Sequence, residues 1–419
     1  MLIRRDIYNQ LISYLNKKEI LIITGARQSG KTTLMKELQN GLAITGQKTV
    51  YLNLDIETDF KICASQQSLL DYITLEIGEK AKGYVFIDEI QIKSNAGSFL
   101  KGLYDMNLNL KFIVSGSGSV ELKEKVSEGL AGRSKLFSIS TLSFSEYLNF
   151  ELNYKYDQKL IEYLQIYPDN KYLNKYMYLG GYPRVVLSNM ASEKSDSLDS
   201  IFISYVDKDL KQLLGVKNTD AILTLLTFFS VRIGKLVNYS EMSKIANISF
   251  ETLKQYLYYM EKTFIISSIK PYFTNPESEL TKNPIYYFND LGMRNYVYNR
   301  LSYYDEIISG SMLFQNLIFL LLSNQSTKPK INYWRTKDKA EVDFVVSVGS
   351  IITPVEVKYS DLTSTTVSRS FTNFINKYSP NVAVVVNKSF SAERKIGLTK
   401  VLFIPYYKLL DINFFDNLN

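Results

Sequence analysis

The sequence predicts an α/β protein whose amino-terminal part folds around a parallel sheet. Short apolar runs at residues 19–24, 49–54, 83–87 and 110–114 indicate buried strands, and helix-like segments separate them. Strands that alternate with helices favour a parallel sheet covered by helices on both faces. A glycine-rich loop, Gly25–Thr32, follows the first apolar run directly, as expected where a strand turns sharply into a helix.

The composition excludes several kinds of chemistry. The chain has 419 residues with no histidine and one cysteine, Cys63. It therefore has no histidine general base, no Ser-His-Asp triad, no Cys/His zinc site and no internal disulfide. Catalysis must depend on carboxylates, lysine, arginine, hydroxyl groups and a bound metal ion. A lone cysteine is typical of a protein in a reducing compartment.

Charge and hydropathy set limits on the partners. The net charge of +7 permits an anionic partner such as DNA but does not require one. No uncharged apolar run reaches about 18 residues, so we expect no membrane span. The first residues carry Arg4 and Arg5 without a following signal-peptide pattern. The cytoplasm is the expected location.

The middle of the chain changes character twice. After an α/β region at residues 1–150, residues 151–218 lose their strand-like runs and become helical. Residues 219–300 hold two short amphipathic segments, Asn238–Ala246 and Ser249–Tyr259, joined by a tight turn. This arrangement predicts a helix-turn-helix, and the extended runs that follow it fit a winged variant.

The last part, residues 301–419, is predicted to be a second α/β unit. A helix-like segment precedes a series of strand-like apolar runs. The helix is expected over 311–323 and the strands over 331–335, 341–348, 351–358 and 381–387.

The glycine-rich loop matches a phosphate-binding P-loop in sequence and in context. Its glycines let backbone N–H groups turn towards bound phosphates, and the following helix amino terminus adds partial positive charge. Lys31 is expected to reach the β- and γ-phosphates, and the Thr32 hydroxyl to hold Mg²⁺. The predicted cofactors are therefore ATP and Mg²⁺. The residues expected at the nucleotide are Gly25, Ala26, Gln28, Ser29, Gly30, Lys31, Thr32, Thr33.

Further elements of an ATPase site follow along the chain. The run 84–87 ends in Asp88, expected to hold Mg²⁺ through water, and Glu89, expected to polarise the attacking water. Ser117, after the next run, is a candidate γ-phosphate sensor, or part of a plain serine-rich turn. Arg133 is a candidate arginine finger for a neighbouring subunit, or an ordinary surface residue. The finger hypothesis implies a homo-oligomer, of which a hexameric ring is one form.

The ordered set of motifs resembles prokaryotic AAA-superfamily ATPases that carry a C-terminal domain of unknown function. The strings LIITGARQSGKTTL, FIDEIQ, VSGSGS, LAGRS and LSFSEYL occur in that order. The resemblance implies an AAA-type core at 1–150, a helical lid at 151–218, a winged helix and a nuclease-like end. Gly180–Pro183 resembles the Gly-Gly-x-Pro element of the lid, which implies that Pro183 lies near the base and that Arg184 approaches the phosphates.

The C-terminal unit resembles restriction-endonuclease-like folds through Asp343, Glu356 and Lys358. Glu356 and Lys358 share one face of a strand, because side chains alternate. A hairpin would let Asp343 and Glu356 converge on a second Mg²⁺, with Lys358 near a water molecule. Gln315 stands where such nucleases often carry an acid. The alternatives are an active nuclease, a degenerate DNA-binding or packing domain, and a salt-bridged structural hairpin.

Three functions fit these patterns. The first is an ATP-driven machine that acts on duplex or branched DNA, for example in repair or recombination, with the segment Ser249–Tyr259 contacting DNA. The second is a nucleotide-operated switch that holds a protein partner in one state. The third is an ATP-regulated, Mg²⁺-dependent nuclease.

Overall fold

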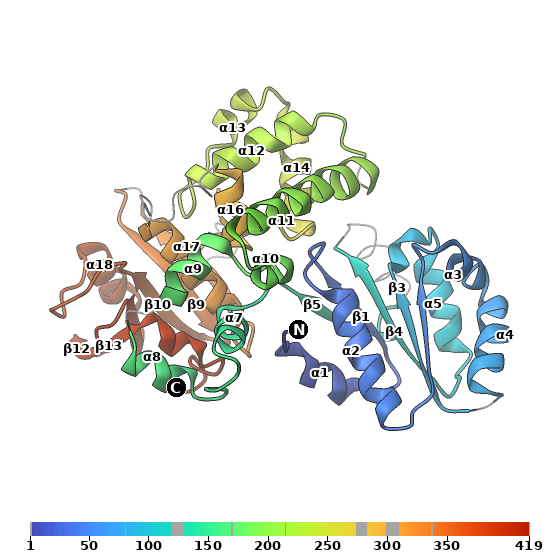
Figure 1. Ribbon diagram of the computed structural model, residues 1–419. Helices are drawn as coiled ribbons and strands as arrows, with labels where there is room; N and C mark the ends of the chain where they lie inside the picture. The colour runs from blue at the N-terminus through green and yellow to red at the C-terminus, as the bar shows by residue number, and fades with distance from the viewer. Residues whose placement is uncertain are drawn as a thin grey trace.

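The protein has two lobes, seen side by side in Figure 1, with a parallel sheet at the centre of the first. The structure is a computed structural model that describes residues 2–79, 81–118, 130–168, 171–213, 215–273, 283–298, 310–336 and 338–418. The first sheet runs in the order β2-β3-β4-β1-β5, and all its neighbouring strands are parallel. Its strands are β1 (Ile20–Gly25), β2 (Thr49–Asn53), β3 (Gly83–Asp88), β4 (Leu110–Ser117) and β5 (Ser134–Ile139).

Helices cover both faces of this sheet, as the alternating pattern predicted. One core lies beneath the first two helices and includes Leu11 and Met35, and a second core lies on the opposite face and includes Leu69 and Phe99. Figure 1 shows α1 and α2 on one side of the strands and α3 to α5 on the other. These helices are α1 (Ile7–Tyr14), α2 (Lys31–Ile44), α3 (Glu57–Ile62), α4 (Gln66–Ile77) and α5 (Ala96–Asp105).

The second lobe begins with helices and shares one continuous core with the end of the chain. Residues as distant in sequence as Phe144, Leu225 and Tyr406 belong to the same buried cluster. The first helices of this lobe are α7 (Phe144–Glu151), α8 (Leu160–Ile166), α9 (Lys171–Leu179), α10 (Pro183–Leu187), α11 (Ala191–Ser204) and the π-helix η2 (Tyr205–Leu213). The helices that follow are α12 (Thr219–Val231), α13 (Tyr239–Ile245), α14 (Phe250–Lys262) and α16 (Leu291–Val297).

A mixed eight-stranded sheet completes the second lobe. Its order is β12-β13-β11-β10-β9-β8-β6-β7, and α17 (Gly310–Ser323) and α18 (Arg369–Tyr378) pack against opposite faces of it. The strands are β6 (Ile266–Pro271), β7 (Ile285–Phe288), β8 (Lys330–Arg335), β9 (Glu341–Val348), β10 (Ile351–Val357), β11 (Val382–Asn387), β12 (Ala392–Ile396) and β13 (Thr399–Pro405). The short helix η3 (Tyr406–Leu410) follows β13. The predicted fold class is confirmed: an α/β protein with a parallel first sheet and a second, mixed sheet.

The expected wing strands lie in this mixed sheet. β6 and β7 form an antiparallel hairpin, and β6 also pairs with β8 through Lys270↔Asn332 and Pro271↔Tyr333. The sheet thus continues across residue 300, where the sequence suggested a boundary. The helix-turn-helix segments are present as α13 and α14, while their assignment to a separate domain stays a prediction.

Candidate nucleotide-binding site

The loop between β1 and α2 has the backbone that a phosphate cradle needs. Gly30 precedes α2 with φ of 98°, a conformation that favours glycine. A Cβ at Gly25 would lie 2.0 Å from the Ile139 carbonyl oxygen, so β5 leaves no room for a side chain there. Lys31 folds back and donates to the carbonyl oxygens of Gly25 (3.2 Å) and Ala26 (2.7 Å). Burial lowers the pKa of Lys31 to about 8.

Asp88 lies at the carboxyl end of β3, opposite the start of α2. Its Oδ2 accepts hydrogen bonds from Thr32 Oγ1 (2.7 Å) and Tyr51 OH (2.8 Å), and its Oδ1 accepts from Ser115 Oγ and from the Glu89 backbone N–H (3.0 Å). A carboxylate and a hydroxyl oxygen in contact are hard donors suited to Mg²⁺, so Thr32 and Asp88 fit the role expected of them.

The backbone conformation at Glu89 sets the direction of its side chain. Glu89 has φ of 55°, in the left-handed region that most residues avoid, which marks a locally constrained turn. Burial raises the pKa of its carboxyl group, and a hydrogen bond from Gln91 opposes that rise. Gln91 also donates to Ser117 Oγ at 3.1 Å, so one amide joins Glu89 to the end of β4.

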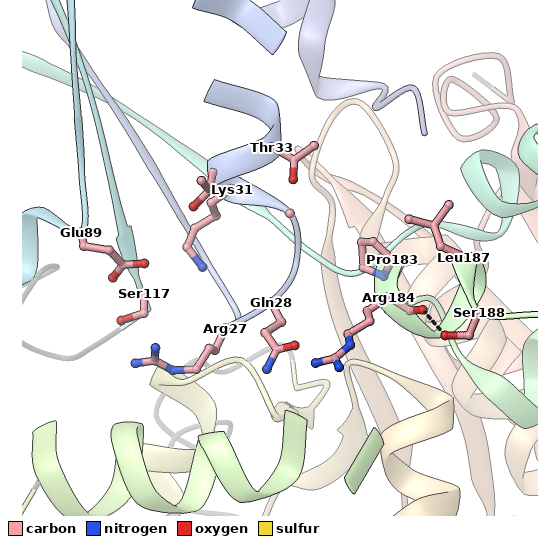
Figure 2. Close-up of a pocket in the computed structure, with 12 residues that line it drawn as sticks. Arg27, Gln28, Lys31, Thr33, Glu89, Ser117, Pro183, Arg184, Leu187 and Ser188 are labelled. Carbon is pink, nitrogen blue, oxygen red and sulfur yellow. Dashed lines mark hydrogen bonds between the residues drawn. The ribbon is translucent and has the colours of Figure 1, made fainter. Parts of the chain in front are cut away.

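An open cavity of about 570 Å³ lies between the P-loop and α10 of the second lobe (Figure 2). Its walls combine Glu89 and Ser117 from the first lobe with Pro183 and Arg184 from the second. The structure therefore brings the predicted residues Lys31, Thr32, Thr33, Gln28, Gly30, Glu89, Ser117 and Pro183 to one cavity. Their roles at a bound nucleotide stay predictions.

The Gly-Gly-x-Pro segment is fixed from both sides. Gly180 has φ of 72°, and the Gly181 N–H donates to Asp290 Oδ2 at 2.8 Å. The Gly181 carbonyl oxygen accepts from the Leu142 N–H at 2.7 Å, at the crossing between the lobes. Pro183 is thereby held against the P-loop, since a Cβ at Gly30 would lie 3.7 Å from it.

Two arginines belong to the site although their roles were not predicted. Arg5 donates to the carbonyl oxygens of Ser29 and Ser140, each at 2.8 Å, and forms a buried ion pair with Glu146 at 3.1 Å. Arg27 lines the cavity and pairs with Asp209 at 2.9 Å. A sequence signal existed only for Arg27, because it lies inside the P-loop.

Arg133 lies away from the cavity. Its carbonyl oxygen accepts from the Ile20 N–H, at the opposite end of β1 from the P-loop, and its guanidinium pairs with Asp105 at 2.9 Å. It does not act on the nucleotide of its own chain in this arrangement. An action on a neighbouring subunit stays a prediction.

The C-terminal residues singled out from sequence do meet. Asp343 Oδ1 accepts from Gln315 Nε2 at 3.0 Å and its Oδ2 from the Val357 N–H at 2.7 Å. Burial raises the pKa of Asp343 to about 7. Lys358 pairs with Glu356 Oε1 at 2.8 Å, whereas the buried Glu356 Oε2 has no hydrogen-bond partner.

This second cluster offers few ligands to a cation, and a metal site there stays a prediction. Glu356 Oε2 is an available hard oxygen, and Asp343 supplies another carboxylate. However, within the described ranges no three acidic or cysteine side chains gather as metal ligands. Gln315 takes the place of a third acid and donates a hydrogen bond to Asp343, which a carboxylate would not do.

Comparisons with known proteins agree with the geometry of the first lobe. Residues 17–148 match the AAA domain family. Residues 170–303 and 311–407 match two further families, both of them domains of unknown function, DUF8612 and DUF4143. The first lobe is thus an AAA-type P-loop domain, a fold that implies nucleotide binding, usually with Mg²⁺.

Relatives of the whole chain are distant. An uncharacterized protein of Haemophilus influenzae is 25% identical over 368 residues, which is 86% of this chain and 87% of the relative. An uncharacterized protein of Methanocaldococcus jannaschii is 27% identical over 354 residues, 82% of this chain and 75% of the relative. Among the described residues, no helix is both long and apolar enough to cross a membrane.

Solved structures match weakly. AMPPCP-bound DnaA from Aquifex aeolicus covers 62% of this chain and 90% of its own, with 16% identity and a TM-score of 0.27. PCH-2 of C. elegans covers 61% and 70%, with 15% identity and a TM-score of 0.30. TM-scores of this size support no inference about this chain.

Proposed function

We propose that the protein binds ATP between its lobes and hydrolyses it to drive work on DNA. The observation that carries the ATPase part is the cavity itself. It combines Lys31 and Thr32 of the P-loop with Glu89 at the end of β3 and Pro183 of the second lobe. A nucleotide in that position would touch both lobes, so hydrolysis would change how they are held together.

The residues divide the work by their chemistry. Backbone N–H groups of the loop and the Lys31 ammonium bind phosphate, for which Lys31 must release the carbonyl oxygens of Gly25 and Ala26. Mg²⁺, when bound by Thr32 and Asp88, neutralises charge that develops on the phosphates. Glu89 accepts a proton from the attacking water, and Gln91 keeps its carboxylate beside Ser117.

The DNA part of the proposal depends on α13 and α14. Ser249 caps α14 by accepting from the Thr252 N–H at 3.1 Å, and Lys254 and Gln255 are exposed on the same helix. Polar and basic side chains near the start of such a helix suit contacts to bases and phosphates. Figure 1 shows α13 at an outer end of the second lobe, and α14 packs against both α13 and the strand β6.

Steady-state ATP hydrolysis, with and without duplex, single-stranded and four-way-junction DNA, tests this function. We expect Mg²⁺-dependent turnover that one form of DNA stimulates several-fold. Lys31→Ala removes binding and Glu89→Gln removes turnover. Turnover that no DNA changes, together with no retention of DNA at low salt, would refute the DNA role and favour a switch acting on a protein partner.

A second activity is favoured by one observation, the unpartnered Glu356 Oε2 beside Asp343 and Lys358. A divalent cation there would give this buried oxygen the positively charged partner that it lacks, as in Mg²⁺-dependent nucleases. Gels of the same DNA samples test it: cleavage that requires Mg²⁺ and disappears in Asp343→Ala is the expected result. Uncut DNA at every Mg²⁺ concentration would leave this cluster a packing or DNA-binding element.

A further inference from the structure

Arg27 is held in an ion pair that crosses the two lobes. Its Nε lies 3.2 and 3.1 Å from Asp209 Oδ1 and Oδ2, and its Nη2 lies 2.9 Å from Oδ1. Two nitrogens of the guanidinium thus bind one carboxylate, the strong geometry for an arginine. The two residues are 182 positions apart, so this contact joins the P-loop to the second lobe.

Arg27 also belongs to the nucleotide cavity. It lines the cavity with Lys31 and Glu89. The Arg27 guanidinium attracts the Glu89 carboxylate and repels the Lys31 ammonium. Figure 2 shows its side chain extending towards Ser117, whereas the Arg184 side chain extends from α10 towards Gln28. Its Nη1 makes no hydrogen bond within the described part of the chain, so both N–H groups of that nitrogen remain available to a ligand.

Asp209 lies in an unusual helix. It belongs to the π-helix η2, a rare form that is frequent at functional sites, and only 4% of the residue is exposed. A buried carboxylate without its partner is strongly destabilising. The buried position of Asp209 is therefore stabilised by its pairing with Arg27. The same helix contacts the end of α14, because Thr263 Oγ1 donates to Tyr205 OH at 3.3 Å.

We propose that Arg27 binds the terminal phosphate of ATP and that Asp209 competes with this phosphate for it. This inference rests on the proposed ATP site. Without a γ-phosphate, the ion pair between Arg27 and Asp209, called the latch below, holds η2 against the P-loop. A triphosphate draws Arg27 away, and the unpaired Asp209 then moves towards water and carries η2 with it. A diphosphate lacks the group that competes, so the latch distinguishes ATP from ADP.

Affinities of a non-hydrolysable ATP analogue and of ADP test the competition. In Asp209→Asn, the analogue is expected to bind about tenfold tighter, while ADP affinity stays within about twofold, because the competitor of the γ-phosphate is gone. Arg27→Ala is expected to bind the analogue about tenfold more weakly, and in that background Asp209→Asn has no further effect. Asp207→Asn, an exposed site on the same helix, is the matched control.

Other results would overturn the inference. Asp209→Asn could leave the ratio of the two affinities unchanged, or could bind the ATP analogue more weakly than the wild type. Either result would mean that Asp209 positions Arg27 and does not compete with the phosphate. Wild-type protein that binds neither nucleotide refutes the proposed function itself. The wild-type protein could bind the ATP analogue, lose that binding in Lys31→Ala, and keep the same ratio of analogue to ADP affinity in Asp209→Asn. That result would refute the latch and leave the proposed ATP site standing.

Hydrogen exchange of the wild-type protein gives a test that needs no variant to fold. The amides of Tyr205–Leu213 are expected to exchange at least several-fold faster with the ATP analogue than with ADP. Equal exchange with both nucleotides would contradict release of the latch.

Discussion

Replacing Arg5 by methionine tests how the P-loop is held in position. The Arg5 side chain is only 7% exposed, and its partner Glu146 is 6% exposed. The guanidinium also donates to the carbonyl oxygens of Ser29, within the P-loop, and Ser140. Methionine fills similar space without the charge, so the change removes the interactions and leaves the packing largely intact.

The expected cost follows from these contacts. Breaking a buried ion pair by removing one partner costs about 3–5 kcal/mol, since the other charge is left uncompensated. Glu146 keeps the backbone donors of Asp6 (2.8 Å) and Ser143 (2.9 Å), which lessens the loss. We therefore expect Arg5→Met to lower the free energy of unfolding by about 3 kcal/mol.

Urea unfolding checks this value. Nucleotide affinity, measured on the folded fraction, checks the position of the P-loop. Arg4→Met is the matched control: its side chain is 69% exposed and lies 3.7 Å from Asp157, so a loss below about 0.5 kcal/mol is expected. Adding Glu146→Gln to Arg5→Met removes the unpaired charge, but the amide NH2 group then faces one of the two backbone N–H groups that donate to Glu146, so the recovery should stay below about 1 kcal/mol. A cost below about 1 kcal/mol for Arg5→Met, or an equal cost for Arg4→Met, would show that the buried Arg5 ion pair does not stabilise the fold in this way.

Two further predictions concern backbone strain and pH. Gly180→Ala should destabilise the protein by at least about 2 kcal/mol, because φ is 72° and the new Cβ would lie 2.2 Å from Asp290 Oδ1. Gly46→Ala, with φ of 77° and open space, should cost only about 1 kcal/mol in the same thermal unfolding assay, and equal losses would contradict this account. Burial lowers the pKa of Lys111 from 10.5 to about 8, so the unfolded chain binds more protons between these values and the free energy of unfolding should rise with pH there. Lys111→Met should remove about 2 kcal/mol of that rise between pH 8 and 10, and an unchanged pH profile would contradict it.

The sequence predicted the elements whose signals are local. The P-loop, β1, β3 and β4 were found because buried strands are continuous apolar runs and the glycine pattern lies within eight residues. The strand β5 was missed, since its residues alternate between exposed and buried positions and resemble a surface segment. The antiparallel β12 was missed for the same reason, as it carries charged residues on an exposed edge.

Long-range partners could not be predicted from one sequence. Arg5 meets Glu146 across 141 residues, and Arg27 meets Asp209 across 182. No periodicity or spacing connects residues so far apart, because their contact depends on how two lobes pack. The convergence of Asp343 and Glu356 was predictable, because the strands β9 and β10 that carry them are consecutive and form a hairpin.

ATP turnover and ATP binding, measured on the same preparations of wild-type protein and Glu89→Gln, test whether this site hydrolyses ATP. Glu89 is placed as the base for the attacking water and not as a ligand of the phosphates. We expect Glu89→Gln to bind ATP within about threefold of wild-type affinity while its turnover falls at least about a hundredfold. Turnover in Glu89→Gln equal to that of the wild type, or a wild-type protein that neither binds nor hydrolyses ATP, would contradict the account.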